Sequence, residues 1–197
     1  MRNFDTLLSE IRSCRICEDN LPCGPRPVIQ ASSTAKILIV GQAPGIRVHE
    51  TGIPFNDPSG DRLREWMGID REQFYDERKI ALVPMGFCYP GTGKTGDLPP
   101  RPECADIWRD EIMEHLKNVE LTLIIGGYAI NWHLKGQKKR TLTETVKCYH
   151  EYGDHIMVLP HPSPRNNIWL KKNPWFQTEI IPELNGRVRK ILISDKN

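Results

Sequence analysis

The chain has 197 residues, of which 39% are hydrophobic and 26% are charged, and its formal net charge is +2. This composition is typical of a soluble globular protein with a good-sized core, and we expect one domain over residues 1–197. No apolar run is long enough to span a bilayer, the N-terminus lacks a signal-peptide core, and the charge is too small to identify a nucleic-acid partner. We therefore expect a cytoplasmic monomer without a membrane partner.

Short aliphatic runs alternate with amphipathic stretches along the chain. The aliphatic runs are rich in β-branched residues and predict buried strands at 37–40, 80–83, 121–125 and 156–159. The amphipathic stretches predict helices at 4–13, 62–67, 103–117, 128–134 and 175–192. We expect Ser59 or Asp61 to cap the second helix, and Pro182 and Gly186 to interrupt the last. This alternation favours a parallel α/β sheet with helices on both faces.

The first predicted strand ends in a loop, residues 41–45, with the sequence Gly-Gln-Ala-Pro-Gly. Two glycines and a proline let the backbone turn sharply and come close to a ligand. Residues 52–55, Gly-Ile-Pro-Phe, follow after a polar stretch. Because open α/β sheets place their sites at the carboxyl ends of parallel strands, we expect this loop to line a site.

A second loop, residues 161–167, has the sequence His-Pro-Ser-Pro-Arg-Asn-Asn and follows the last predicted strand. It should therefore lie at the same edge of the sheet as the first loop. The surrounding segment 133–172 contains eight basic and three acidic residues, a local charge of +5. A solvated face is the simpler interpretation of that surplus, and contact with a phosphate backbone is the functional alternative.

Residues 91–96, Gly-Thr-Gly-Lys-Thr-Gly, match the spacing of a phosphate-binding glycine loop. Such a loop must open a helix, and Pro99, Pro100 and Pro102 prevent a helix directly after these glycines. A Walker A loop would also need glycine at the position of Cys88. We therefore predict a flexible surface loop here and no nucleotide site.

Six cysteines occur in the chain, and two of them form the pair Cys14-x-x-Cys17. In a cytoplasmic protein, clustered cysteines bind metal more often than they form disulfides. Cys88, near the end of the second strand region, and Cys104, in the first turn of a predicted helix, are the other candidate ligands. The residue types alone do not separate zinc from an iron–sulfur cluster.

These motifs resemble those of the uracil-DNA glycosylase superfamily. Motif 1 of that superfamily is a strand, then G-x-[AND]-P-[GY], then G-x-P-F. Residues 41–45, 52–55 and Gly60 have its spacing in the family 4, iron–sulfur branch. Residues 161–164 have the H-P-S-P form of motif 2 that the single-strand-selective branch carries. The resemblance implies a three-layer α/β/α fold with a central, mostly parallel four-stranded sheet.

The resemblance also implies an activity on DNA. A member would be a hydrolase of base excision repair that cleaves the N-glycosidic bond of uracil or a related damaged base in DNA. A non-catalytic, nucleic-acid-binding relative on the same scaffold is the alternative. Family 4 proteins hold a [4Fe–4S] cluster on four cysteines, which correspond in spacing to Cys14, Cys17, Cys88 and Cys104. Zinc on the same thiolates, or no metal, is the alternative.

Individual residues receive roles from the same resemblance. Phe55 matches the residue that stacks on uracil, His161 would stabilise negative charge on the leaving base, and Gln42 would position water. The other residues expected at the substrate are Gly41, Ala43, Pro44, Gly45, Asn56, Ser163 and Arg165. Two features depart from the family: motif 1 has no carboxylate, and Pro84 replaces the asparagine that reads the uracil edge in family 4.

Overall fold

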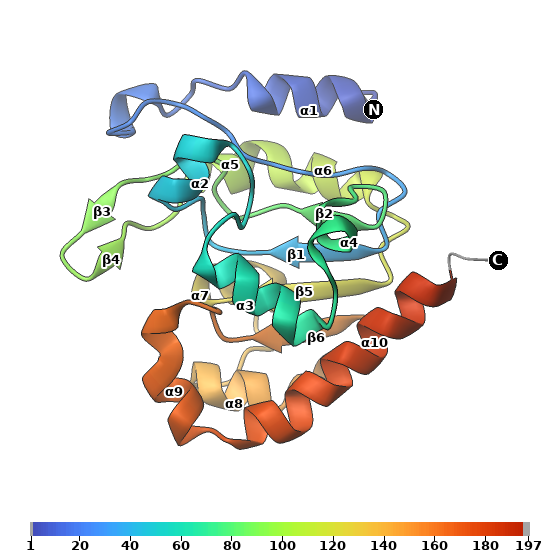
Figure 1. Ribbon diagram of the computed structural model, residues 1–197. Helices are drawn as coiled ribbons and strands as arrows, with labels where there is room; N and C mark the ends of the chain where they lie inside the picture. The colour runs from blue at the N-terminus through green and yellow to red at the C-terminus, as the bar shows by residue number, and fades with distance from the viewer. Residues whose placement is uncertain (1, 195–197) are drawn as a thin grey trace.

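A sheet of four parallel strands forms the centre of the structure, a computed structural model that describes residues 2–194 (Figure 1). The strands lie in the order β2-β1-β5-β6, with bounds β1 (Ile37–Val40), β2 (Ile80–Leu82), β5 (Leu121–Ile125) and β6 (Ile156–Leu159). Every residue of β1 and β2 is buried because helices cover both faces, which explains the unbroken aliphatic runs. The four predicted strands are confirmed, and the second ends at Leu82 instead of Val83.

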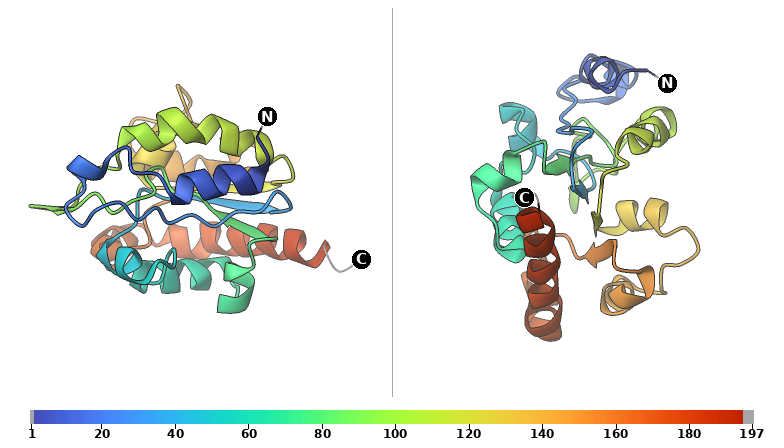
Figure 2. Two further views of the ribbon diagram at one scale, coloured as in Figure 1. Left: turned by 90° about the horizontal axis from the view of Figure 1, so that it is seen from above. Right: turned by 90° about the vertical axis from the view of Figure 1, so that its right-hand side faces the viewer.

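Helices form the two outer layers (Figures 1 and 2). α3 (Pro58–Met67) and α10 (Ile181–Ser194) cover one face of the sheet, and α6 (Asp110–His115) and α7 (Gly127–His133) cover the other. The predicted three-layer α/β/α architecture is therefore confirmed. α1 (Phe4–Arg12) packs against α6, and the shorter helices are α2 (Ile46–Thr51), α4 (Arg71–Tyr75), α5 (Pro102–Cys104), α8 (Leu142–Lys147) and α9 (Asn167–Lys172). No helix in the described residues is long and apolar enough to cross a membrane.

The start of α3 differs from the prediction. The helix begins at Pro58, and its N-cap is Asp57, neither Ser59 nor Asp61. The Asp57 Oδ1 atom accepts a hydrogen bond from the Gly60 amide at 2.9 Å. Proline suits the first helical position because its fixed φ is already helical and its missing N–H is not needed there. Because of the acidic cap and the proline, the helix begins about one full turn earlier than predicted.

The C-terminal helical region runs without the predicted interruptions. A π-helical turn at Phe176–Ile180 leads directly into α10, which continues through both Pro182 and Gly186. Pro182 lies just after the π-helical turn, so its missing backbone donor falls where the helical hydrogen-bond pattern already changes. Beyond it, Leu184 and Val188 are fully buried, so packing against the core holds the helix across the glycine. The predicted helix at 103–117 likewise includes a π-helical turn, at Ala105–Arg109, between α5 and α6.

The glycine-rich segment predicted as a flexible surface loop forms a small antiparallel hairpin. Its strands are β3 (Thr92–Gly93) and β4 (Gly96–Asp97), with Thr92 opposite Asp97. The hairpin projects from the body of the molecule (Figure 1). The Leu98 amide donates to the Gly91 carbonyl at 2.8 Å and closes its base. The segment opens no helix, as expected from the prolines that follow it.

Candidate functional site

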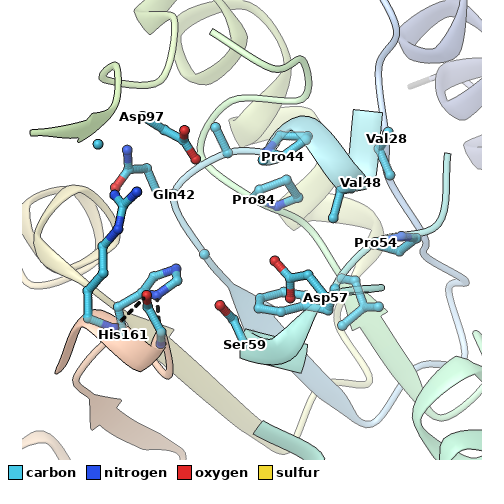
Figure 3. A pocket seen from close by; sticks show the side chains of 18 of the residues that line it. Val28, Gln42, Pro44, Val48, Pro54, Asp57, Ser59, Pro84, Asp97 and His161 are labelled. Carbon is cyan, nitrogen blue, oxygen red and sulfur yellow. Dashed lines mark hydrogen bonds between the residues drawn. The ribbon is translucent and has the colours of Figure 1, made fainter. Parts of the chain in front are cut away.

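A pocket of about 440 Å³ opens at the carboxyl ends of the central strands (Figure 3). Four segments form most of its lining: the loop 41–45 after β1, the segment 54–59 that enters α3, the hairpin, and the loop 161–166 after β6. The two loops predicted to share one edge of the sheet therefore face one cavity. The predicted substrate residues that line it are Gly41, Gln42, Ala43, Pro44, Gly45, Phe55, His161, Ser163 and Arg165.

Phe55 is held in an unusual conformation at the wall of the pocket. Its φ is +53°, and it is the only residue other than glycine with positive φ in the described part of the chain. Such strain is tolerated where the surrounding structure fixes the backbone. Gly60 makes the fixation possible, because a Cβ at that position would overlap the Phe55 carbonyl oxygen. A Cβ on Gly41 would stand 3.3 Å from Phe55 Cζ, so the aromatic ring lies close against the Gly41 backbone.

The edge of Phe55 is supported from the core. Its ring meets that of Phe74 edge-to-face, with 6.1 Å between the centroids. The Tyr75 hydroxyl donates to the Pro54 carbonyl at 2.9 Å and fixes the chain just before the phenylalanine. The pocket therefore contains a rigid aromatic surface on which a planar group can stack.

His161 presents a hydrogen-bond donor to the same pocket. The Ser163 amide donates to His161 Nδ1 at 3.2 Å, so in the neutral ring the proton is on Nε2. Burial is the main cause that lowers the pKa of His161 below its usual value. The nearby Arg165 lowers this pKa further, whereas Asp57 and Asp97 raise it. With a lowered pKa, the imidazole is neutral at pH 7 and carries its proton on Nε2.

The hairpin is joined to both pocket loops. Gln42 Nε2 donates to the Leu98 carbonyl at 3.2 Å, which leaves the Gln42 Oε1 atom as the free acceptor. From the other loop, the Arg165 guanidinium reaches Gly96, where a Cβ would overlap its Nη1 atom. A side chain at position 96 would therefore displace Arg165. The hairpin is thus a wall of the pocket, which the sequence pattern did not indicate.

Asn56 is the one predicted substrate residue that does not line the pocket. Its Oδ1 atom instead accepts a hydrogen bond from Arg71 Nη2 at 3.1 Å. Pro84 does line the pocket, where it offers no side-chain hydrogen bond. The structure adds polar residues that the sequence interpretation did not place there, namely Asp57, Ser59, Thr95, Asp97 and Asn166. The run Asp-Pro-Ser-Gly at the start of α3 was a readable cap signal for Asp57, whereas no local signal marked Asp97.

Four of the six cysteines line a second, small hollow. They are Cys14, Cys17, Cys88 and Cys104, and prolines, Leu21, Phe87 and Arg101 complete its wall. Burial raises the pKa of the Cys88 thiol to about 11 and that of Cys104 to about 12. Within residues 2–194, no three His, Cys, Asp or Glu side chains are grouped as ligands of a single metal ion. The hollow therefore brings together the four predicted ligands without forming a single-ion site.

The basic segment 133–172 contains cations with different partners. Lys139 is paired with Glu151, and Lys138 donates to Asn131 Oδ1 at 2.6 Å. Arg165 lies at the pocket itself. The basic residues of this segment therefore do not form one patch: Arg165 lies at the pocket rim, whereas Lys138 and Lys139 lie between α7 and α8.

Comparison with known proteins gives one family. The sequence model described as the uracil DNA glycosylase superfamily matches residues 29–185. The match includes both pocket loops, the hairpin and all four strands of the central sheet. Cys88 and Cys104 lie within it, and Cys14 and Cys17 precede it.

Proposed function

The chain belongs to the uracil DNA glycosylase superfamily, and on that premise we propose that it is a DNA glycosylase. It hydrolyses the bond between the sugar and a flipped uracil or related damaged base in DNA. The observation that carries this proposal is the pairing of two features in one pocket. A rigid Phe55 ring lies ready to stack on a base, and the neutral His161 presents Nε2–H to the same space.

Stacking and charge stabilisation are the two demands of this chemistry. A glycosylase takes its target base out of the duplex, and an aromatic ring stabilises the extruded base by stacking on its face. Cleavage of the glycosidic bond leaves negative charge on the base. A fixed N–H donor placed where that charge develops lowers the barrier, and the half-buried His161 is such a donor.

The remaining predicted residues position water and the DNA strand. Gln42 Oε1 can orient a water molecule, but an amide cannot take its proton. Arg165 is exposed at the rim of the pocket, where its charge can meet a phosphate. Ser163 Oγ already accepts from the Arg165 amide at 3.2 Å, which fixes this loop and leaves the hydroxyl hydrogen for a phosphate oxygen.

A base-release assay tests the proposal. Single- and double-stranded oligonucleotides that contain uracil or another deaminated base are incubated with the parent protein and with Phe55→Ala and His161→Ala variants. We expect release by the parent and a loss of about 10²- to 10³-fold with His161→Ala, as for other fixed donors. His150→Ala, at an exposed histidine outside the pocket, is the matched control and should keep the parent rate.

One observation favours a second candidate function. Motif 1 has Gln42 and Ala43 where other branches keep a carboxylate or asparagine, and Pro84 cannot read a base edge. A non-catalytic module that binds extruded bases would retain the stacking surface without these groups. Tight, Phe55-dependent binding of damaged DNA with no base release would support this module and overturn the glycosylase proposal.

We also propose that Cys14, Cys17, Cys88 and Cys104 hold a [4Fe–4S] cluster. The donor set fits, because four thiolates are the usual ligands of such a cluster and all four cysteines surround one hollow. A bound cluster would supply a covalent cross-link here. Its four cysteines would join the N-terminal region to α5 and to the chain after β2, which continues from Pro84 at the pocket.

Metal analysis after purification without oxygen tests the cluster. We expect a brown protein with iron and acid-labile sulfide, and loss of both in Cys17→Ser. Cys148→Ser is the control, because Cys148 does not line the hollow. Stoichiometric zinc, or a colourless protein without iron under these conditions, would overturn this proposal.

A further inference from the structure

The pocket contains two carboxylates although motif 1 has none. Asp57 comes from the segment that enters α3, and Asp97 comes from the hairpin. Figure 3 shows Asp57 in the part of the pocket occupied by Ser59, whereas Asp97 lies toward Gln42 and Pro44. Both carboxylates are close enough to His161 to raise its pKa. Hydrolysis of a glycosidic bond needs a group that can take a proton from water, and a carboxylate can do so where Gln42 cannot.

Asp57 is the better fixed of the two. Its Oδ1 atom accepts the Gly60 amide at 2.9 Å as the N-cap of α3, and Pro58 follows it directly. Within the described residues, Oδ2 has no hydrogen-bond partner and remains available to water. Asp57 also stands only two positions after Phe55, in the chain segment whose strained turn is fixed by the close approach of Gly60. Its carboxylate is therefore held beside the surface on which the base would stack.

Asp97 lacks this fixation. It lies in the two-residue strand β4 of the projecting hairpin, and its residue is exposed, whereas Asp57 is half-buried. Catalytic groups act best when they are positioned before the reaction, because reorganisation during the step adds to the barrier. The capped helix terminus provides that positioning, and the hairpin strand does not.

We propose that Asp57 is the catalytic base of the glycosylase, in place of the carboxylate absent from motif 1; this inference rests on the proposed function. The bond between the sugar C1′ and the base nitrogen breaks, and its electron pair leaves with the base. His161 Nε2–H hydrogen-bonds the base anion. The water oxygen forms a bond to C1′, and one water proton passes to Asp57 Oδ2. Asp57 then releases this proton to solvent, and the base anion takes one from solvent.

The same carboxylate also faces the sugar as positive charge grows on it. A negative charge near C1′ favours that charge in the transition state. Asp57 and His161 thereby act on opposite charges of one separating pair, the sugar cation and the base anion. This arrangement explains how a pocket without a motif 1 carboxylate retains the means for hydrolysis.

Asp57→Asn separates catalysis from structure, because asparagine caps a helix as well as aspartate does. Single-turnover base release by the variant should fall by about 10²- to 10⁴-fold, the usual contribution of general acid–base catalysis. Its melting temperature and its affinity for the uncleaved oligonucleotide should not change. Asp70→Asn is the matched control: Asp70 caps α4 by accepting the Gln73 amide at 2.7 Å and does not line the pocket.

The maximal rate and the substrate affinity together give a readout that a structural role would not move. In single-turnover kinetics, Asp57→Asn should lower the maximal rate of base release and leave unchanged the enzyme concentration that gives half of that rate. Asp57→Ser, which also preserves a capping oxygen, should lose the same activity and guards against an unforeseen folding defect.

The outcomes separate the two proposals. An active parent with unchanged release by Asp57→Asn overturns the assignment of Asp57 and leaves the glycosylase intact. Loss of release with Asp97→Asn instead overturns it in favour of the hairpin carboxylate. A parent that binds damaged DNA and releases none of the bases tested overturns the proposed function, and the role of Asp57 falls with it.

Discussion

Acidification should weaken this fold through one half-buried histidine, His133. His133 ends α7, and its Nε2 atom lies 3.3 Å from Arg109 Nη1. Burial, followed by the charges of Arg109 and Lys135, lowers the pKa of His133 from 6.5 to about 3. Arg109 is itself fully buried and donates to the Val83 carbonyl at 3.2 Å and to the Pro84 carbonyl. Protonation of His133 would therefore place a second positive charge next to that of Arg109, beside the end of β2 that leads to the pocket.

The sign and size of the effect follow from the two pKa values. Between pH 6.5 and about 3, the unfolded chain binds a proton at His133 that the native protein does not. The free energy of unfolding is unaffected by this group above pH 6.5 and decreases as the pH falls below it. The decrease is about 1.4 kcal/mol per pH unit, so that His133 lowers the stability by about 2 kcal/mol at pH 5. His161, whose pKa is also lowered by burial, acts in the same direction.

Urea unfolding at pH 7.5 and pH 5 measures this difference. His133→Gln keeps a neutral polar partner for Arg109 but does not titrate. We expect the parent to lose about 2 kcal/mol more stability than this variant between the two pH values. His150→Gln, at an exposed histidine, should behave like the parent. Equal losses in the parent and in His133→Gln would refute the reasoning, because the acid sensitivity would then come from other groups.

Three further changes have defined outcomes. Gln42→Glu should slow base release, because the substitution replaces the amide donor to the Leu98 carbonyl with an oxygen that the carbonyl repels. We expect this although other branches keep a carboxylate in motif 1, and faster release in the same assay would contradict it. Gly60→Ala should reduce base release by on the order of 10²-fold, since a Cβ would displace the Phe55 backbone and misplacement of about 1 Å has that cost; circular dichroism would check that the variant is folded. Charge reversal over 138–140 should flatten the log–log dependence of DNA affinity on salt by up to about three units; an unchanged slope would exclude this segment from the interface.

Local sequence was sufficient for the elements that form the core. The aliphatic runs of β1, β5 and β6 matched their strands because a strand buried on both faces has no polar position to interrupt its pattern. The loops after β1 and β6 could be assigned to one edge because parallel strands all end on the same side of the sheet. Their shared pocket follows from chain direction alone.

The ends and interruptions of helices were harder to predict from the sequence, because tertiary contacts override local conformational preference there. Pro182 and Gly186 both disfavour a helix, yet α10 passes through them because its buried face packs on the core. The hairpin at 91–98 has a loop-like composition. Its order comes from contacts with Gln42 and Arg165, which are far away in the sequence.

For the site itself, the sequence determined which motifs belong together, and the tertiary structure decided which side chains reach the pocket. Residues in the loops after β1 and β6 line it as expected, because each loop continues directly from a core strand. Asn56 and Asp57 are adjacent in the sequence. The Asn56 side chain nevertheless points away from the pocket and accepts from Arg71, whereas the Asp57 side chain lines the pocket and caps α3. Which of two neighbouring polar side chains faces a cavity depends on the turn between them, and here close packing of Gly60 against the backbone of Phe55 fixes that turn.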